Sequence, residues 1–260
     1  MMTEAVRMDA YRRSISAVCP GKVVCEIGVG LAPLSLMALE AGATRGYGVE
    51  FHAETLDVAV QIIAANGYGP DRFIPIQGLS TEISLPERVD VLLSETLDSM
   101  GIGENTAVYM ADARARLMAP DAVFLPATLD CHVALASPQA YASEMAFWNE
   151  TMPGAYGFDY ARASEEFKTC KHTLSVLSAE LHSGWSPWQT IDFLDDATYR
   201  RLVPMAIPVT RAGTILGFAT AFDAELSEGV HLRTFPDDPE THWFQGFNAF
   251  PEPIKAEAGD

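Results

Sequence analysis

The stretch KVVCEIGVG, Lys22–Gly30, joins an apolar run to two closely spaced glycines. The run predicts a short buried strand, and a helix is expected from about Leu31 to Glu40. Pro33 suits the first turn of that helix, because its missing amide would have no helical partner. Glycines between a strand and a helix permit a tight turn and the close approach of a ligand. An ordinary strand-to-helix turn is the alternative for Gly28 and Gly30.

The alternation of strand and helix patterns continues along the first half of the chain. Strands are expected at 46–50, 73–77 and 89–93, and helices at 3–18, 52–65 and 105–118. This order predicts βαβ units and a parallel sheet. The pattern changes near Pro126, where we place a domain boundary. Beyond it, β-rich segments at 127–136, 206–210 and 214–222 predict an antiparallel half, and the aromatic-rich segment 141–160 predicts an inserted helical arm.

Composition narrows the class of protein. A formal net charge of -18 argues against nucleic-acid binding, which needs basic side chains, and favours a cationic substrate or simply solubility. The four cysteines have the spacing of neither a zinc site nor a disulfide framework, so reduced thiols in a cytoplasmic enzyme without a metal are expected. The chain has no signal-peptide pattern and no apolar run that would span a membrane, so no membrane partner is expected.

Acidic residues near the glycine loop indicate which cofactor it binds. Glu50 ends the second predicted strand, where an acid can bond ribose hydroxyls, and this suits NAD as well as S-adenosylmethionine. Glu26 precedes the first glycine and would repel a pyrophosphate but attract the ammonium group of a methionine moiety. Pro33 at the third fingerprint position also favours the methyl donor. Glu82, just past the third strand, is either an adenine contact or a surface acid.

A second loop, Ser94–Glu104, carries an acid at each end, Glu95 and Glu104. It follows the apolar run 89–93, and ligands of open α/β sheets bind beyond the carboxyl ends of the strands. Two convergent carboxylates suit a fork-shaped cation such as a guanidinium. Glu104 has an alternative role as a first-turn helix acid that favours the macrodipole. Asp98 either adds negative charge to the pocket or stays solvated.

Together these motifs resemble the protein arginine N-methyltransferase family, from about Val6 to Phe247. The matching segments stand in the family's order: Val6-Arg7, Val24–Gly30, Gly48-Val49-Glu50, Ser94–Glu104, Tyr156–Asp159 and Thr241-His242-Trp243. The resemblance implies an α/β fold with a Rossmann-like doubly wound methyltransferase domain at 1–125. An antiparallel β-barrel-like domain at 126–260 would follow, with a helical dimerisation arm at about 139–175 and a homodimer as the assembly.

The resemblance also implies the activity, which is methyl transfer from S-adenosylmethionine to arginine in a protein, a peptide or free arginine. Arg7 would bind the cofactor carboxylate, and the loop with His242 and Trp243 would close the arginine pocket. The predicted cofactor residues are Arg7, Glu26, Gly28, Gly30, Glu50 and Glu82. The predicted catalytic residues are Glu95, Glu104 and His242, and the predicted substrate-binding residues are Trp243 and Asp98. Compared with the family's pattern, we expect the usual N-terminal helix and the last barrel strands to be absent from this sequence.

The expected chemistry follows from the guanidinium, whose pKa above 12 keeps it protonated. Glu95 and Glu104 would hold it, polarise one nitrogen and position that nitrogen for transfer. The proton would leave to Glu104 or through His242. After Glu95 the chain has Thr96-Leu97-Asp98, whereas the family's common form has Trp-Met-Gly. The pattern in this chain is more similar to the branch of the family that makes monomethyl or symmetric dimethyl arginine. A related amine or amidine methyltransferase and a non-catalytic homologue remain the alternatives.

Overall fold

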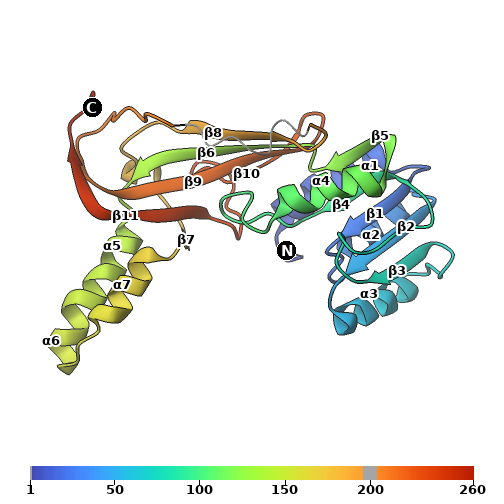
Figure 1. The fold of residues 1–260 in the computed structure, drawn as a ribbon, viewed down its shortest axis with the longest axis horizontal. Helices are drawn as coiled ribbons and strands as arrows, with labels where there is room; N and C mark the ends of the chain where they lie inside the picture. The colour runs from blue at the N-terminus through green and yellow to red at the C-terminus, as the bar shows by residue number, and fades with distance from the viewer. Residues whose placement is uncertain (1, 196–203) are drawn as a thin grey trace.

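The computed structural model describes residues 2–195 and 204–260, and it contains two sheets that lie end to end (Figure 1). The first sheet is parallel, with the strand order β3-β2-β1-β4-β5. Its strands are β1 (Val23–Ile27), β2 (Arg45–Glu50), β3 (Phe73–Gln77), β4 (Val89–Ser94) and β5 (Met118–Leu125). Its helices are α1 (Ala5–Val18), α2 (Pro33–Glu40), α3 (Ala53–Ala65) and α4 (Thr106–Arg116). The chain reverses its strand order between β1 and β4, and such a switch point is where ligands bind.

The sequence predicted this half well except at its edge. Strands β1 and β4 are buried almost throughout, as expected for strands covered on both faces. The helix expected to reach Met118 ends at Arg116 instead, and Met118 begins β5, which the sequence analysis missed. The strand was missed because Pro120 lies inside it, and proline is uncommon within strands. The strand tolerates a proline because β5 is at the edge of the sheet and its pairing with β4 is irregular there.

The second sheet is antiparallel, with the order β7-β11-β9-β6-β8 and with β10 beside β9. Its strands are β6 (Thr128–Ala136), β7 (His172–Leu174), β8 (Ser186–Asp192), β9 (Gly213–Ser227), β10 (Val230–Arg233) and β11 (Gln245–Ala256). The strand expected at 206–210 is wrong. That segment is irregular, and the amides of Val209 and Thr210 donate to the carbonyls of Asp260 and His182. Strand β11 was missed because it contains two prolines, at a break in its pairing with β9.

A helical arm projects from the second sheet, away from the parallel sheet (Figure 1). It consists of α5 (Gln139–Ala146), the π-helical turn η1 (Phe147–Thr151), α6 (Met152–Tyr156) and α7 (Ala161–Thr169). At its base Tyr141 stacks on Phe167 with ring centroids 6.0 Å apart and packs against Phe247 at 4.9 Å. Towards its tip Tyr156 and Phe158 are about three-fifths exposed, at 62% and 61%.

The two sheets share one apolar core. The same buried cluster contains Leu93 and Phe124 of the parallel sheet and Phe193 and Phe222 of the antiparallel half. Helix α1 also joins them, because Ser14 Oγ lies 2.8 Å from the hydroxyl of Ser227 at the end of β9. The predicted fold class is confirmed, whereas the division into domains 1–125 and 126–260 stays a prediction. No helix in the described parts of the chain is long and apolar enough to cross a membrane.

Candidate active site

The glycine loop after β1 has the backbone that the sequence predicted. Gly28 has φ +74° and Gly30 has φ +52°, both in the left-handed region that favours glycine. The carboxylate of Glu50, at the end of β2, accepts hydrogen bonds from the amides of Gly30 at 3.1 Å and His52 at 3.0 Å. Glu50 therefore fastens the glycine loop to the neighbouring strand while it remains only partly buried.

Glu26 lies within β1 rather than in the loop, and it is 3% exposed. Its Oε2 accepts hydrogen bonds from the amide of Ser35 at 2.8 Å and from the Ser35 hydroxyl at 2.5 Å. Burial raises the pKa of Glu26 to about 8, and the nearby carboxylates of Glu95 and Glu50 act in the same direction, whereas Ser35 opposes the rise. A buried acid with this pKa gains its charge when a cation binds beside it.

A cavity of about 380 Å³ lies over the glycine loop. It is lined by residues 28–31 and Pro33 of the loop and by Met2 and Thr3 from the start of the chain. The N-terminal residues thus cover the position where a cofactor would meet the glycines. Glu82, the remaining predicted cofactor residue, is exposed in the turn after β3, one strand beyond Glu50.

Glu95 and Glu104 have different environments within one loop. Glu95 immediately follows β4 and is largely buried, with its Oε2 3.3 Å from Nη1 of Arg7. Burial raises the pKa of Glu95 to about 7, against the opposing effect of Arg7. Glu104 lies just before α4 and is exposed. Its pKa is raised by partial burial and by Asp98, and the ammonium of Lys171 opposes that rise.

Asp98 folds the loop between the two glutamates. Its Oδ1 accepts hydrogen bonds from the amides of Met100 at 3.0 Å and Gly103 at 2.8 Å, and its Oδ2 pairs with Lys171. A side chain at position 103 would collide with the Asp98 carboxylate, at 1.9 Å from Oδ2, and would therefore displace that carboxylate. Asp98 was predicted to bind substrate, but both of its oxygens are engaged within the protein.

Arg7 is the centre of a buried charged cluster. Helix α1, which carries it, is fixed over β4 by a hydrogen bond from the Tyr11 hydroxyl to the Ser94 carbonyl at 2.9 Å. Arg7 is 1% exposed, and its guanidinium contacts Glu4 at 3.0 Å in addition to Glu95. Its buried Nε has no hydrogen-bond partner within residues 2–195 and 204–260. An unpaired buried donor of this kind is suited to an incoming carboxylate.

His242 reaches the same cluster from the loop before β11. Its Nδ1 lies 3.1 Å from Oε2 of Glu4, and its backbone amide donates to the same oxygen. The pKa of His242 is lowered by burial and by the charge of Arg7, while Glu4 opposes both. Sequence reasoning missed Glu4, although its position three residues before Arg7 places the two on one helix face. That spacing is the signal that could have found it.

Trp243 is a buried residue beside Arg7 and the double-glutamate loop. It is 4% exposed, and its Nε1 donates to the carbonyl of Leu97 at 2.7 Å. The guanidinium carbon of Arg7 is 4.5 Å from its ring centroid, and Phe222 packs edge-on at 5.3 Å. Trp243 therefore joins the double-glutamate loop to the antiparallel sheet. Its predicted contact with substrate stays a prediction.

The family of the chain is decided by its second half. A sequence model of the arginine methyltransferase oligomerization subdomain matches residues 127–260, slightly more than half of the chain. The chain belongs to the arginine methyltransferase family. This arginine methyltransferase family member is 29% identical over 259 residues to the "Arginine N(omega)-methyltransferase" of Streptomyces achromogenes subsp. streptozoticus, covering 97% of the chain and 69% of that relative. It is also 29% identical to "Protein arginine N-methyltransferase 1" of Dictyostelium discoideum, covering 100% of the chain and 77% of the relative.

Other relatives are longer, and the chain spans about half of them. One is the "Probable histone-arginine methyltransferase 1.3" of Arabidopsis thaliana, 28% identical, of which the chain covers 51%. Among solved structures, the Trypanosoma brucei PRMT1 enzyme-prozyme heterotetrameric complex with AdoHcy matches with a TM-score of 0.86 and 25% identity, covering 100% of this chain and 83% of that one. Arabidopsis thaliana protein arginine methyltransferase 10 shares the fold, with a TM-score of 0.81 and 23% identity over 99% of this chain and 83% of that one.

These comparisons confirm the predicted family. At the level of that family they also confirm an arginine-methylating enzyme with S-adenosylmethionine as the methyl donor. The roles of single residues in this arginine methyltransferase stay predictions. The structure brings Arg7, Glu95, His242 and Trp243 into one cluster, and it leaves Glu82 at the surface.

Proposed function

We propose that the chain transfers the methyl group of S-adenosylmethionine to a guanidinium nitrogen of arginine, in a protein, a peptide or free arginine. The observation that carries the proposal is the position of Glu95. It follows β4 at the switch point of the parallel sheet, next to the strand that leads into the glycine loop. An acid there can hold a cationic acceptor beside the methyl donor.

The residues around the glycine loop fit the methyl donor. Arg7 offers an unpaired buried donor for its carboxylate, and Glu26 offers a carboxyl group for its ammonium. Glu50, which already accepts two backbone hydrogen bonds, retains partial exposure for a ribose hydroxyl. When bound, S-adenosylmethionine supplies an electrophilic methyl group on a positively charged sulfur. The protein contributes binding, orientation and compensating charge.

The two glutamates have distinct tasks in this proposal. Glu95 is held by Arg7 and is buried, so it orients the guanidinium and draws positive charge away from the attacking nitrogen. Glu104 is exposed at the other end of the loop and contacts the substrate from the solvent side. Because arginine binding requires ionised acids, the pKa of about 7 for Glu95 means that substrate affinity rises as the pH increases through neutrality.

Proton release falls to Glu104 or to His242. Methylation makes the attacking nitrogen acidic, so a base within reach accepts its proton. The pKa of His242 is lowered by burial and by the charge of Arg7, which favours the neutral ring, and the ring lies with Nδ1 against Glu4 and is about half exposed. Trp243 and Asp98 act in this proposal by positioning the loop between the glutamates, through Leu97 and through the amides of Met100 and Gly103.

The test is methyl transfer from labelled S-adenosylmethionine to free arginine, to arginine-rich peptides and to a matched peptide with lysine in place of arginine. Mass spectrometry of the product should place the label on a guanidinium nitrogen, and it also counts the methyl groups. Label on the lysine peptide or on another amine would support the alternative methyltransferase. Cofactor binding measured by calorimetry, without transfer to any guanidinium, would support a non-catalytic homologue and overturn the proposal.

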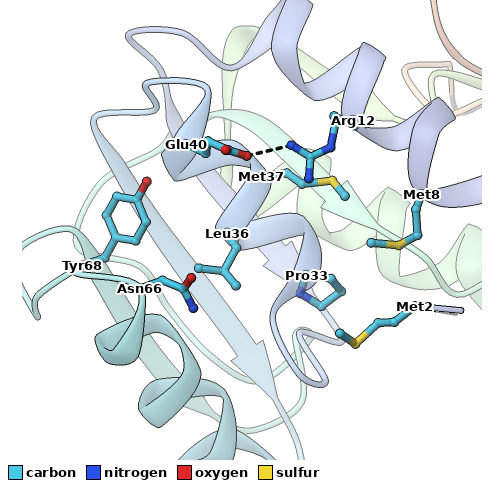
Figure 2. A pocket seen from close by; sticks show the side chains of 9 residues that line it. All are labelled: Met2, Met8, Arg12, Pro33, Leu36, Met37, Glu40, Asn66 and Tyr68. Carbon is cyan, nitrogen blue, oxygen red and sulfur yellow. Dashed lines mark hydrogen bonds and ion pairs between the residues drawn. The ribbon is translucent and has the colours of Figure 1, made fainter. Parts of the chain in front are cut away.

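We further propose that the functional unit is a homodimer in the cytoplasm. The arm projects from one end of the molecule (Figure 1) and carries exposed aromatic side chains. A cleft of about 440 Å³ is lined by side chains of α1 and α2, which belong to the parallel half. Figure 2 shows Met8 and Met37 on its walls, with the Arg12–Glu40 ion pair of 2.8 Å beside them. Methionine walls suit aromatic side chains. Free cysteines agree with a reducing compartment.

A two-fold pair would place each arm in the cleft of its partner, since an arm cannot reach the cleft of its own chain. Met2 and Pro33 line both the cleft and the cavity over the glycine loop, so the partner's arm would also lie beside the cofactor site. Sedimentation equilibrium should show a dimer that Tyr156→Asp with Phe158→Asp converts to a monomer. Leu177→Asp, at a residue outside the arm with 59% exposure, is the matched control. A monomeric wild-type protein would contradict the homodimer.

A further inference from the structure

One lysine connects the base of the arm with the double-glutamate loop. Lys171 lies between α7 and β7, and its Nζ forms an ion pair with Oδ2 of Asp98. The Asp98 side chain is 12% exposed and that of Lys171 is 36% exposed, so the pair is partly withdrawn from solvent. Ion pairs in such places act more strongly than pairs at an open surface.

Asp98 transmits this contact to the end of the loop that carries Glu104. Its other oxygen accepts hydrogen bonds from the amides of Met100 and Gly103, and Gly103 directly precedes Glu104. The Asp98 carboxylate lies so close to Gly103 that a side chain at position 103 would displace it. The position of Asp98 therefore determines where the backbone places Glu104.

A second contact runs in parallel with the first. The Thr173 hydroxyl donates to the Ser99 hydroxyl at 3.3 Å, and the Ser99 carbonyl accepts from the Thr220 hydroxyl at 3.2 Å. Residues 171 and 173 lie on the same face of an extended segment, and the residue between them lies on the opposite face. His172 accordingly packs against Phe167 of the arm, with ring centroids 4.4 Å apart. This short segment thus contacts the loop on one face and the arm on the other.

The same lysine balances charge around Glu104. Three charged groups act on this site: Glu95 from the end of β4, Asp98 from within the loop and Lys171 from the base of the arm. From α4, Tyr109 contributes a hydroxyl that donates to the Glu104 carbonyl. Asp98 raises the pKa of Glu104 and Lys171 lowers it. Without the lysine, the negative charge of Asp98 would act on Glu104 without the opposing charge of Lys171.

We infer that Lys171 is a positioning residue for arginine methylation, which holds Asp98, and through it the Glu104 end of the loop, in a productive arrangement. The inference rests on the proposed function of this loop. Lys171 acts from the arm and through Asp98 rather than by touching substrate. It follows that the segment joining the arm to β7 contributes a side chain that shapes the substrate pocket of its own chain.

The test compares Lys171→Met, Lys171→Arg and the control Lys168→Met in the full chain. Lys168 is also a partly exposed lysine of the arm, but its ammonium lies 3.9 Å from Glu252 and away from the loop. We expect Lys171→Met to lower kcat/KM about 10-fold at pH 7 and to move the acid limb of its pH profile to higher pH. Lys171→Arg should restore most of both. Lys168→Met should match the wild type, and S-adenosylmethionine affinity should be unchanged throughout.

A double-mutant cycle with Asp98→Asn separates positioning from damage to the arm. If the pair acts as a unit, Lys171→Met adds little to the defect of Asp98→Asn, and the two effects are strongly non-additive. Additive effects, or a Lys171→Met pH profile that superimposes on that of Lys168→Met, would overturn the inference. An inactive wild-type protein would instead refute the proposed function, so the two failures are distinguishable. Sedimentation of Lys171→Met should show the same assembly as the wild type.

Discussion

The cofactor loop and the arginine pocket lie side by side but are built in different ways. Around the cofactor loop, the key hydrogen bonds join residues that are close in the sequence: Ser35 and Glu26 are nine positions apart, and Gly30 and Glu50 are 20 positions apart. In the arginine pocket, the contacts join residues that are far apart in the sequence. Trp243 reaches Leu97 across 146 positions, and His242 reaches Glu4 across 238.

The two sites therefore depend on different parts of the fold. The cofactor loop needs only the first strands of the parallel sheet and the helix that follows β1. The arginine pocket exists only when α1, the double-glutamate loop and the segment before β11 pack together, so it depends on the docking of the two sheets. Substitutions in the first region should change cofactor binding selectively, whereas those in the second should change catalysis and stability together.

The largest expected effect is that of Glu95→Gln, which removes the buried charge of the pocket but keeps its shape. We expect kcat/KM to fall by about 10²–10³, the range for loss of one preorganised electrostatic contact. The affinity for S-adenosylmethionine should change only a few-fold. Glu87→Gln, at an exposed acid paired with Arg45, is the control and should match the wild type. Full activity of Glu95→Gln in a steady-state assay would rule out the two-glutamate mechanism.

Glu26→Gln should weaken the cofactor site without reorganising the arginine pocket. Loss of a charge-assisted contact to an ammonium corresponds to about 10–100-fold in the dissociation constant of S-adenosylmethionine. Isothermal calorimetry measures this directly. Under saturating cofactor, kcat should recover to near the wild-type value. A fall in kcat that saturation does not repair would mean that the two regions are not separable at Glu26.

Trp243→Phe tests how far the arginine pocket depends on contacts between residues that are distant in the sequence. It removes the hydrogen bond to the Leu97 carbonyl and retains an aromatic ring over Arg7. Unfolding by urea should show a loss of about 1–3 kcal/mol in free energy, and kcat should fall about 10-fold because the loop shifts. Trp188→Phe is a matched control, because the buried Trp188 Nε1 has no partner within the described residues. Equal effects of the two substitutions would contradict a specific role for Trp243.

Without bound cofactor, the pH dependence of stability should show the effect of ionising Glu26. Burial raises its pKa from the ordinary value of 4.5 to about 8 in the folded state. The folded state therefore holds this proton more tightly than the unfolded state does. The contribution of protonated Glu26 to the free energy of unfolding is complete below pH 4.5 and disappears as the pH rises through about 8. Glu26→Gln should be more thermostable than the wild type at pH 8, by about 3 °C for each kcal/mol, and the difference should shrink at pH 5. A difference independent of pH, measured by calorimetry, would contradict this assignment.

The smallest expected effect is that of Glu82→Gln. The residue was predicted to contact the adenine, but its side chain is exposed in the turn after β3. An exposed polar contact contributes little, so the dissociation constant of S-adenosylmethionine should change less than about threefold. A tenfold change would show that this turn closes on the cofactor and that the predicted role is correct.

Sequence reasoning succeeded where local pattern decides structure. The run Val24–Ile27 and the glycines after it predicted β1 and its loop, because burial on both faces and positive φ leave direct traces in residue type. It failed at Pro120 and around Pro251, where prolines interrupt the β pattern but edge pairing or a bulge tolerates them. It also failed at 206–210, where a β-rich composition belongs to an irregular segment.

By itself, the sequence determined the parallel half, the glycine loop and the presence of two acids on one loop after β4. Only the tertiary structure decided what surrounds those acids. Burial raises the pKa of Glu95 to about 7 against the opposing charge of Arg7. Glu4 joins the cluster from the N-cap position of α1, and Trp243 and Lys171 hold the loop from the second half of the chain. The reason is physical: strand and turn patterns are local, whereas charge, burial and loop position depend on side chains that meet only after the two sheets pack.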